Sequence, residues 1–430
     1  MMKKYYLNDL SAQKLSELSL RKHLLSEDIF KTVKTIGEQV KTEGDKALLA
    51  MAEKYDKVKL ASLTVSADEK REALSALDND LKLAIDTAFD NISRFHASQM
   101  PESKKTETYP GVLCWQEFRA IEKVGLYVPG GSAPLFSTAL MLAVPAMIAG
   151  SKEIYICTPP DKNGKVHPAV VYIADKCKVS AIYKAGGAGA IFAMTYGTES
   201  VQKVDKIFGP GNQFVTAAKM AVSRDVSIDM PAGPSEVMVM ADSSSDPEIV
   251  ASDLLAQAEH GPDSQAVLIC ADDAFAAKVL AAAENQKAIL PRRLIAEKAL
   301  DNSFIIVAPD LTESMRFVNM YAPEHLIIGV DDWEKFIPLI ENAGSVFLGK
   351  NASESFGDYA SGTNHTLPTS GFARSLGGVS LMSFGKMLTF QTVNDAALAS
   401  LGRDVEVMAA AEGLDAHKNS VSIRIKQCGK

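Results

Sequence analysis

The histidines of this 430-residue chain are the first candidates for chemistry, because there are only seven of them. In LAQAEHGP, Gln257 and His260 lie three positions apart at the end of a predicted helix, so their side chains share a face and can bind one ion. FGDYASGTNH places Asp358 and His365 in a predicted loop. Carboxamides, carboxylates and imidazoles all bind metals, so these segments are candidates for a metal site.

A further acid and imidazole, Glu412 and His417, occur near the C-terminus in AEGLDAHKN. A carboxamide, a carboxylate and two imidazoles from these segments would form a mixed nitrogen and oxygen ligand set that suits zinc, with manganese or cobalt as substitutes. Spacing alone does not show that the side chains converge, and each residue by itself is also typical of a polar residue at a helix end.

The pair Glu324 and His325 in YAPEHL combines an acid with an imidazole, just after a proline that opens a new element. Such a pair suits general acid/base catalysis near neutral pH. The alternative interpretation is a carboxylate at the start of a helix followed by a surface histidine, and the residue types do not separate the two.

Glycine-rich turns are the remaining candidates, although the chain has no GxGxxG after its first strand, no GxxxxGK[ST] and no HExxH. Paired glycines let backbone amides approach a pyrophosphate, but they are equally compatible with tight turns. The pairs are Gly130-Gly131, Gly186-Gly187 and Gly209 with Gly211.

The elements that must position these residues follow a regular pattern. From residue 122 onward, short apolar runs such as EKVGLYV and EIYIC alternate with helical patterns, which predicts an α/β fold with parallel sheets. Each run leads into a glycine- or proline-rich turn, and ligands of such sheets bind at these carboxyl ends. A second series of the same kind follows the polar stretch at 241–247.

The two ends of the chain show a different pattern. Residues 26–99 have apolar residues at helical spacing and a capping box of Ser66 and Glu69, so they are predicted to be helical. The segment 99–112 contains two prolines and clustered charges and is expected to be a loop or linker. After about residue 380 the pattern indicates a helical appendage that ends in a possible strand, VSIRI.

Composition and charge exclude several classes of partner. The formal net charge is -8 without any basic stripe, so nucleic acid is not expected. No apolar run reaches ~18 residues and the N-terminus lacks an apolar core of signal-peptide length, so we expect a cytoplasmic protein without membrane contact. The five cysteines form no CxxC pair and predict neither disulfides nor a cysteine zinc site.

Several longer blocks of the sequence resemble the histidinol dehydrogenase family. In the order of the family they are VGLYVPGGSAPLFST, FGPGNQFVTAAK, DMPAGPSEV, SDLLAQAEHGPDSQA, YAPEHLI, GDYASGTNHTLPT and AHKNSV. The resemblance extends from about residue 20 to the C-terminus. It implies an enzyme that oxidises L-histidinol through L-histidinal to L-histidine, in the final steps of histidine biosynthesis. This four-electron reaction consumes two NAD at one site.

The resemblance also implies roles for individual residues. The zinc ligands, for one ion per subunit, match Gln257, His260, Asp358 and His417. Zinc in this family holds the imidazole and amino nitrogens of the substrate and so orients the alcohol. His325 matches the base that accepts the alcohol proton, and Glu324 matches the residue that helps to activate water for hydration of the aldehyde.

Other residues match family positions that line the substrate and the cofactor. The further substrate residues are Ser235, His365 and Glu412, and the NAD contacts are Tyr127 and Asn212. The sequence departs from the family at Gly189, where a glutamine is common, so weaker NAD binding is expected unless a backbone amide or a water makes the contact. The unusual polar loop 161–168 is predicted to expose His167 at the surface.

The family fold implies two incomplete Rossmann-like domains with parallel sheets, plus small N- and C-terminal helical pieces. The implied parts are a helical arm over 1–23, a discontinuous domain over 24–127 and 235–379 with the zinc and catalytic residues, an inserted NAD-side domain over 128–234, and an exchanged C-terminal domain over 380–430. A homodimer is also implied, in which His417 and Glu412 are donated across the interface.

Other functions remain open at this point. A paralogue within the family would oxidise another small amino or hydroxy alcohol. A non-catalytic metabolite-binding protein would reuse the same lobes, but intact Glu324 and His325 disfavour it. A zinc hydrolase would use the ligands to activate water, and the absence of an HExxH-like base on the ligand helix disfavours that reading.

Overall fold

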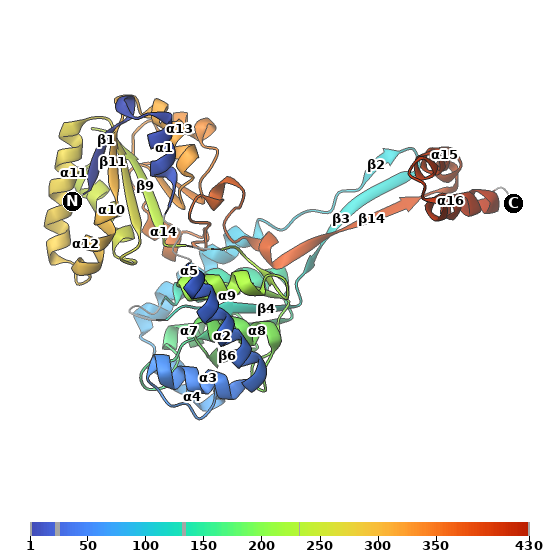
Figure 1. Ribbon diagram of the computed structural model, residues 1–430, viewed down its shortest axis with the longest axis horizontal. Coiled ribbons are helices and arrows are strands. Elements are labelled where there is room, and N and C mark those ends of the chain that lie inside the picture. The colour runs from blue at the N-terminus through green and yellow to red at the C-terminus, as the bar shows by residue number, and fades with distance from the viewer. Residues whose placement is uncertain (1, 22–25, 131–134, 232, 429–430) are drawn as a thin grey trace. The chain divides into compact units, whose positions relative to one another are not determined.

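A computed structural model of the chain describes residues 2–21, 26–130, 135–231 and 233–428. The chain forms two compact units: Met1–Ser98 with Ile121–Phe384, and Gln99–Ala120 with Gly385–Lys430 (Figure 1). The first unit contains two parallel sheets with helices, as the sequence pattern predicts. Within the described ranges, no helix is long and apolar enough to span a membrane.

The larger parallel sheet has the strand order β1-β11-β10-β9-β12-β13. Its strands are β1 (Lys3–Tyr6), β9 (Glu236–Ala241), β10 (Gln265–Cys270), β11 (Phe304–Val307), β12 (His325–Ile328) and β13 (Ser345–Leu348). Its helices are α1 (Ala12–Ser19), α10 (Pro247–Ala258), α11 (Asp273–Ile289), α12 (Arg293–Asp301), α13 (Leu311–Tyr321) and α14 (Glu354–Tyr359). The N-terminal segment, expected to be helical, thus also contributes the edge strand β1.

Strand β9 is central to this sheet and is buried on both faces. Val237 and Val239 pack against the core of α10, α11 and α12, whereas Met238 and Met240 pack against the core of α13. A strand buried on both faces is apolar throughout and does not alternate. β9 was not predicted from the sequence, and its methionines are not among the residues enriched in strands.

The second parallel sheet has the order β6-β5-β4-β7-β8. Its strands are β4 (Lys123–Tyr127), β5 (Glu153–Thr158), β6 (Ala181–Lys184), β7 (Lys206–Phe208) and β8 (Ser227–Ile228). The surrounding helices are α2 (Glu27–Glu43), α3 (Asp45–Met51), α4 (Ala67–Ala76), α5 (Asn79–Ala97), α6 (Ser137–Ala149), α7 (Pro168–Lys176), α8 (Gly187–Tyr196) and α9 (Gln213–Val222). The helices predicted before residue 99 are therefore confirmed, as is the capping box of Ser66 and Glu69.

The FGPGN turn after β7 depends on a glycine. Gly209 has a φ of +125°, and a Cβ atom there would lie 2.1 Å from the carbonyl oxygen of Tyr127. The buried ion pair of Lys219 and Asp229 holds the turn: Lys219 Nζ donates to the Gly209 carbonyl at 2.9 Å, and the Gly209 N–H donates to Asp229 at 2.8 Å. The turn follows the carboxyl ends of β4 and β7, where the strand order reverses and ligands of such sheets bind.

The second unit corrects three expectations. It consists of β2 (Thr106–Tyr109), β3 (Val112–Ala120), β14 (Gly385–Val393), α15 (Asp395–Ala411) and α16 (Asp415–Cys428). The segment expected to be a linker contains β2, and the region expected to be helical contains β14, which pairs antiparallel with β3. VSIRI is helical and not a strand, because Val421 and Ile425 lie four residues apart and pack on Gly402 of α15.

Gly209→Ala is expected to destabilise the chain by roughly 3 kcal/mol or more, because the positive φ and the contact with the Tyr127 carbonyl both oppose a side chain. Gly150→Ala is the control, since Gly150 has a φ of +88° but no atom within 4 Å of the new Cβ. The strain alone should cost about 1–2 kcal/mol there. Denaturant unfolding measures both changes, and equal losses would contradict the role of the Tyr127 contact.

Candidate active site

The predicted acid/base pair and two of the predicted metal residues, His260 and Asp358, meet at the amino end of the larger sheet. His325 is the first residue of β12, where it pairs with Val237 of β9. Ser235 directly precedes β9, and His260 lies in the connection from α10 to β10. We expected ligands to bind at the carboxyl ends of the parallel strands. This site lies at the opposite end, because it is built from the connections that lead into the strands.

A cavity of about 110 Å³ lies at this site and is lined by most of the predicted residues. They are Ser235, His260, Glu324, His325, Asp358 and His365. Gln257 is fully buried on the last turn of α10, just before His260. The fold therefore brings together candidates from the residue patterns with Ser235, which was expected from the family resemblance alone.

A tight turn between α13 and β12 places the acid/base pair. Ala322 ends α13 in the left-handed conformation with a φ of +52°, and Pro323 prevents the helix from continuing. Glu324 and His325 follow at once and are 5% and 3% exposed. The interpretation of His325 as a surface histidine is thereby excluded.

The peptide groups of Glu236 hold both members of the pair. Its N–H donates to Glu324 Oε2 at 2.8 Å, and its carbonyl oxygen lies 3.2 Å from His325 Nδ1. A carbonyl only accepts hydrogen bonds, so His325 Nδ1 carries a proton. His325 Nε2 lies 3.6 Å from Asp358 Oδ1 and is the nitrogen available for chemistry.

Buried negative charge shifts the titration of the site. Burial raises the pKa of Glu324 to about 8 and also raises the pKa of Glu354. Burial lowers the pKa of His325, but the carboxylates of Glu354 and Glu324 outweigh this effect and raise the pKa to about 10. The cluster thus has a surplus of negative charge in a dry environment, which favours a cation.

Glu354 is a site residue that the sequence analysis missed. It begins α14, one turn before Asp358, and is 2% exposed. Ligand atoms of His260, Glu354 and Asp358 lie within 4.8 Å of one another. The four-residue spacing of Glu354 and Asp358 could have indicated two carboxylates on one face of a helix. Asp358 was instead predicted to lie in a loop, and the structure places both residues on α14.

Several buried polar atoms of the predicted site residues and of Glu354 have no hydrogen-bond partner among the described residues. They are Gln257 Nε2 and Oε1, Glu354 Oε1 and Oε2, Asp358 Oδ1, His325 Nε2 and His365 Nε2. Leaving such atoms unpaired is costly, and a metal ion with its bound ligand would satisfy them. A carboxamide, an imidazole and carboxylates form a donor set that fits zinc.

The other two predicted residues belong to the second unit. His417 lies on α16, and Glu412 follows the end of α15. Both are exposed there. Their assignment to the metal and the substrate stays a prediction.

A larger cavity of about 1120 Å³ lies at the carboxyl ends of the second sheet. Its lining includes the predicted cofactor residues and glycine turns, namely Tyr127, Asn212, Gly130, Gly186 and Gly187, whereas Gly131 lies outside the described residues. The Gly187 N–H donates to the Tyr127 hydroxyl at 3.0 Å, and burial raises the pKa of that phenol to about 12. Leu135 lines both cavities, so the two adjoin.

Two features of the larger cavity refine the sequence analysis. A side chain at Gly189 would begin 2.8 Å from Met51 Sδ, so α3 occupies space that a longer residue would need. His167 is half-buried at the start of α7, where its Nδ1 accepts from the Ala169 N–H at 3.2 Å, and it lines the cavity. The prediction that His167 lies on the surface is therefore wrong.

Comparisons with known proteins agree over the whole chain. The family model of histidinol dehydrogenase matches residues 19–425. The chain is 55% identical over 416 residues to the histidinol dehydrogenase of Bacteroides thetaiotaomicron, covering 96% of this chain and 97% of the relative. It is 50% identical over 429 residues to the chloroplastic histidinol dehydrogenase of Arabidopsis thaliana, covering 99% and 92%. The crystal structure of histidinol dehydrogenase from Elizabethkingia anophelis matches with a TM-score of 0.96 and 49% identity, covering 100% and 99%.

Glu354→Gln is expected to weaken zinc binding by about 10- to 100-fold, because it removes a buried negative charge beside the other donors. The readout is the zinc-dependent rise of the melting temperature, which needs no activity assay. Glu259→Gln is the control, since Glu259 is a neighbouring carboxylate that does not belong to the cluster. A zinc response of Glu354→Gln equal to that of the control would remove Glu354 from the site.

Proposed function

Since the chain belongs to the histidinol dehydrogenase family, whose enzymes oxidise histidinol in histidine biosynthesis, we propose that it does so with zinc and NAD. The proposed reaction takes L-histidinol through L-histidinal to L-histidine at one site and reduces two NAD. The observation that carries the proposal is the set of unpartnered donors, Gln257, Glu354 and Asp358, beside a buried Glu324 and His325 pair.

The donor set implies how the substrate is held. Gln257, His260 and Asp358, with Glu354 beside them, would hold the metal. Zinc bound there would orient the imidazole and amino nitrogens of the substrate and offset the charge of the carboxylates around His325. An imidazole-bearing alcohol therefore suits this site better than an alcohol without a metal-binding ring.

The chain's own residues would carry the proton steps. His325 keeps one proton on Nδ1 through the Glu236 carbonyl and presents Nε2 to accept the alcohol proton as hydride leaves for NAD. A cation that offset the charge of Glu354 would remove the largest of the effects that raise the pKa of His325, and so would favour the neutral ring that this role needs. Glu324, held by the Glu236 N–H, would help to remove a proton from the water that hydrates the aldehyde.

We assign NAD to the larger cavity, because it adjoins the small one and begins at the glycine turns. The first turn of α8, at Gly187, presents backbone N–H groups that favour an anion such as a pyrophosphate. Tyr127 and Asn212 would contact the cofactor, although the Asn212 side-chain oxygen already caps α9. The amide nitrogen of the Asn212 side chain would then be the group that donates a hydrogen bond to NAD.

We propose a homodimer in which His417 and Glu412 of one subunit complete the site of the other. Both residues are exposed in the second unit. Exposed apolar side chains on the same two helices, including Val407 at 62% and Met408 at 66%, support an interface there. Homodimers with closed symmetry are the commonest oligomers, so a reciprocal exchange of both residues is consistent with one interface.

The purified protein should reduce two NAD for each histidinol consumed and contain about one zinc per chain. Both follow from one metal-held substrate that stays bound through two hydride transfers. Absorbance at the NADH wavelength and metal analysis measure them. Release of the aldehyde after one NAD would contradict the four-electron reaction, and activity confined to another small amino alcohol would favour a paralogue.

Mixing inactive His325→Asn and His417→Asn proteins under conditions of subunit exchange should restore about a quarter of wild-type activity. About half of all dimers then combine one subunit of each kind, and one of the two sites of each such dimer has both histidines intact. Activity of refolded mixtures is measured against each variant refolded alone. Absence of recovery, with mixed dimers demonstrated by mass, would place His417 in its own subunit's site.

A further inference from the structure

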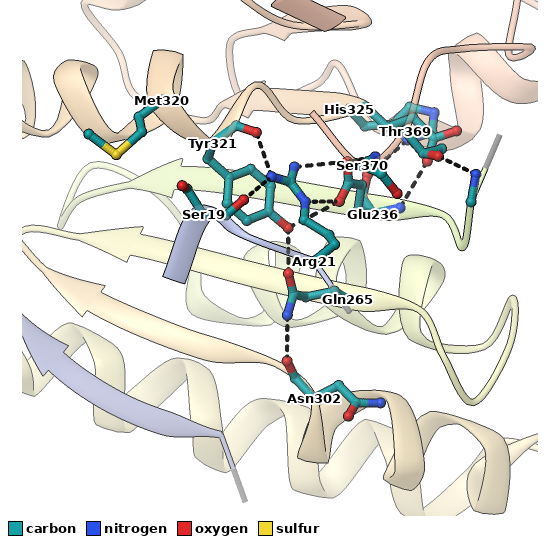
Figure 2. Close-up of polar contacts among 12 residues, drawn as sticks. Ser19, Arg21, Glu236, Gln265, Asn302, Met320, Tyr321, His325, Thr369 and Ser370 are labelled. Atoms are coloured by element: carbon teal, nitrogen blue, oxygen red, sulfur yellow. Dashed lines mark hydrogen bonds and ion pairs between the residues drawn. The ribbon is translucent and has the colours of Figure 1, made fainter. Parts of the chain in front are cut away.

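The guanidinium of Arg21, just after α1, is buried against the start of β9. Its Nε and Nη2 donate to the two carboxylate oxygens of Glu236 at 2.6 and 2.9 Å, and its Nη1 donates to the carbonyls of Ser19 and Tyr321 at 2.6 Å each. The guanidinium also lies 3.4 Å from the ring centroid of Tyr321 (Figure 2). The paired side chains are only 11% and 2% exposed, so Arg21 and Glu236 form a buried, two-point ion pair.

Glu236 connects this ion pair to the acid/base residues. Its carboxylate accepts hydrogen bonds from Arg21 and, at 2.9 Å, from the N–H of Ser370 (Figure 2). Ser370 follows Thr369, which lines the small cavity. Its own N–H and carbonyl contact Glu324 and His325. One residue therefore has its side chain held by Arg21 and its peptide groups in contact with both members of the pair.

Stability alone does not explain such an ion pair. Burying a carboxylate and a guanidinium costs desolvation energy that their attraction often only balances, so apolar residues of similar size would stabilise the fold as well. A two-point ion pair adds fixed geometry, because the guanidinium fork allows one orientation of the carboxylate. At the start of β9, that geometry is transmitted to the peptide groups that hold Glu324 and His325.

We infer that Arg21 is a positioning residue, which fixes Glu236 and thereby orients Glu324 and His325 for proton transfer. The inference rests on the proposed function, since it takes these two residues as the acid/base pair. Without the guanidinium, the Glu236 carboxylate would be buried without a counterion, which is costly. The carboxylate would then become protonated or move toward water, and the start of β9 would shift with it. Groups that bind zinc and NAD lie on other elements and would keep their places.

The test compares Arg21→Met and Arg21→Lys in the full-length, zinc-loaded protein. Arg21→Met should lower kcat by about 100-fold, the scale expected when reacting groups are misplaced by roughly 1 Å. KM for NAD and zinc content should be unchanged, and the isotope effect on kcat with histidinol deuterated at the carbinol carbon should rise. Arg21→Lys should give an intermediate kcat, because an ammonium restores the charge without the parallel pair of hydrogen bonds.

Two controls separate positioning from general loss of structure. Lys4→Met removes an exposed ion pair with Asp273 from the same N-terminal segment and should leave kcat unchanged. Leu268→Ala truncates a fully buried residue of β10 and lowers the melting temperature without touching the network. Arg21→Met should lower kcat far more than Leu268→Ala does at a comparable loss of melting temperature.

The outcomes are distinguishable from failure of the proposed function. If wild-type protein does not oxidise histidinol, the proposed function itself fails. If wild-type is active and His325→Asn is inactive, but Arg21→Met behaves like Leu268→Ala or loses its zinc, only the positioning role is overturned. A kcat of Arg21→Lys no higher than that of Arg21→Met would also overturn it.

Discussion

Burial of negative charge is the constraint on which the site depends. Glu236, Glu324 and Glu354 are each at most 5% exposed, and Asp358 joins them around His325. A buried carboxylate is costly unless it is paired or hydrogen-bonded. The fold offsets this cost with a guanidinium for Glu236 and a backbone N–H for Glu324. The carboxylate oxygens of Glu354 have no hydrogen-bond partner among the described residues, so a cation would have to offset their burial.

The fold makes this arrangement possible by collecting connections at one end of a sheet. The residues before β9, β10 and β12 all lie where parallel strands begin, so segments far apart in sequence meet there. The second sheet instead uses its carboxyl ends, where turns with glycine give a large cavity. The two parallel sheets have a similar strand order but use opposite ends. The larger sheet lines the small cavity with its amino end, and the second sheet lines the adjoining large cavity with its carboxyl end.

Local spacing marked some of the candidate residues and the family resemblance supplied others such as Ser235, whereas a long-range pair escaped both. Gln257 and His260 were identifiable because helix geometry relates neighbours on one turn. The Arg21 and Glu236 pair joins residues 215 positions apart, and nothing local in either segment marks it. The same holds for β3 and β14, which lie far apart in the chain and form half-exposed strands that lack a continuous apolar run.

Under the proposed function, the charge around His325 would link metal binding to catalysis. Its Nδ1 proton is fixed by a carbonyl, so the only change of charge open to the ring is at Nε2, which faces Asp358. With the carboxylates uncompensated, the raised pKa of His325 keeps Nε2 protonated and unable to accept a proton. Under the proposed function, a divalent cation at Glu354 and Asp358 would offset their part of that negative charge and leave the part of Glu324. Filling the proposed metal site would therefore make His325 a better base, which would couple proton transfer to the group proposed to hold the substrate.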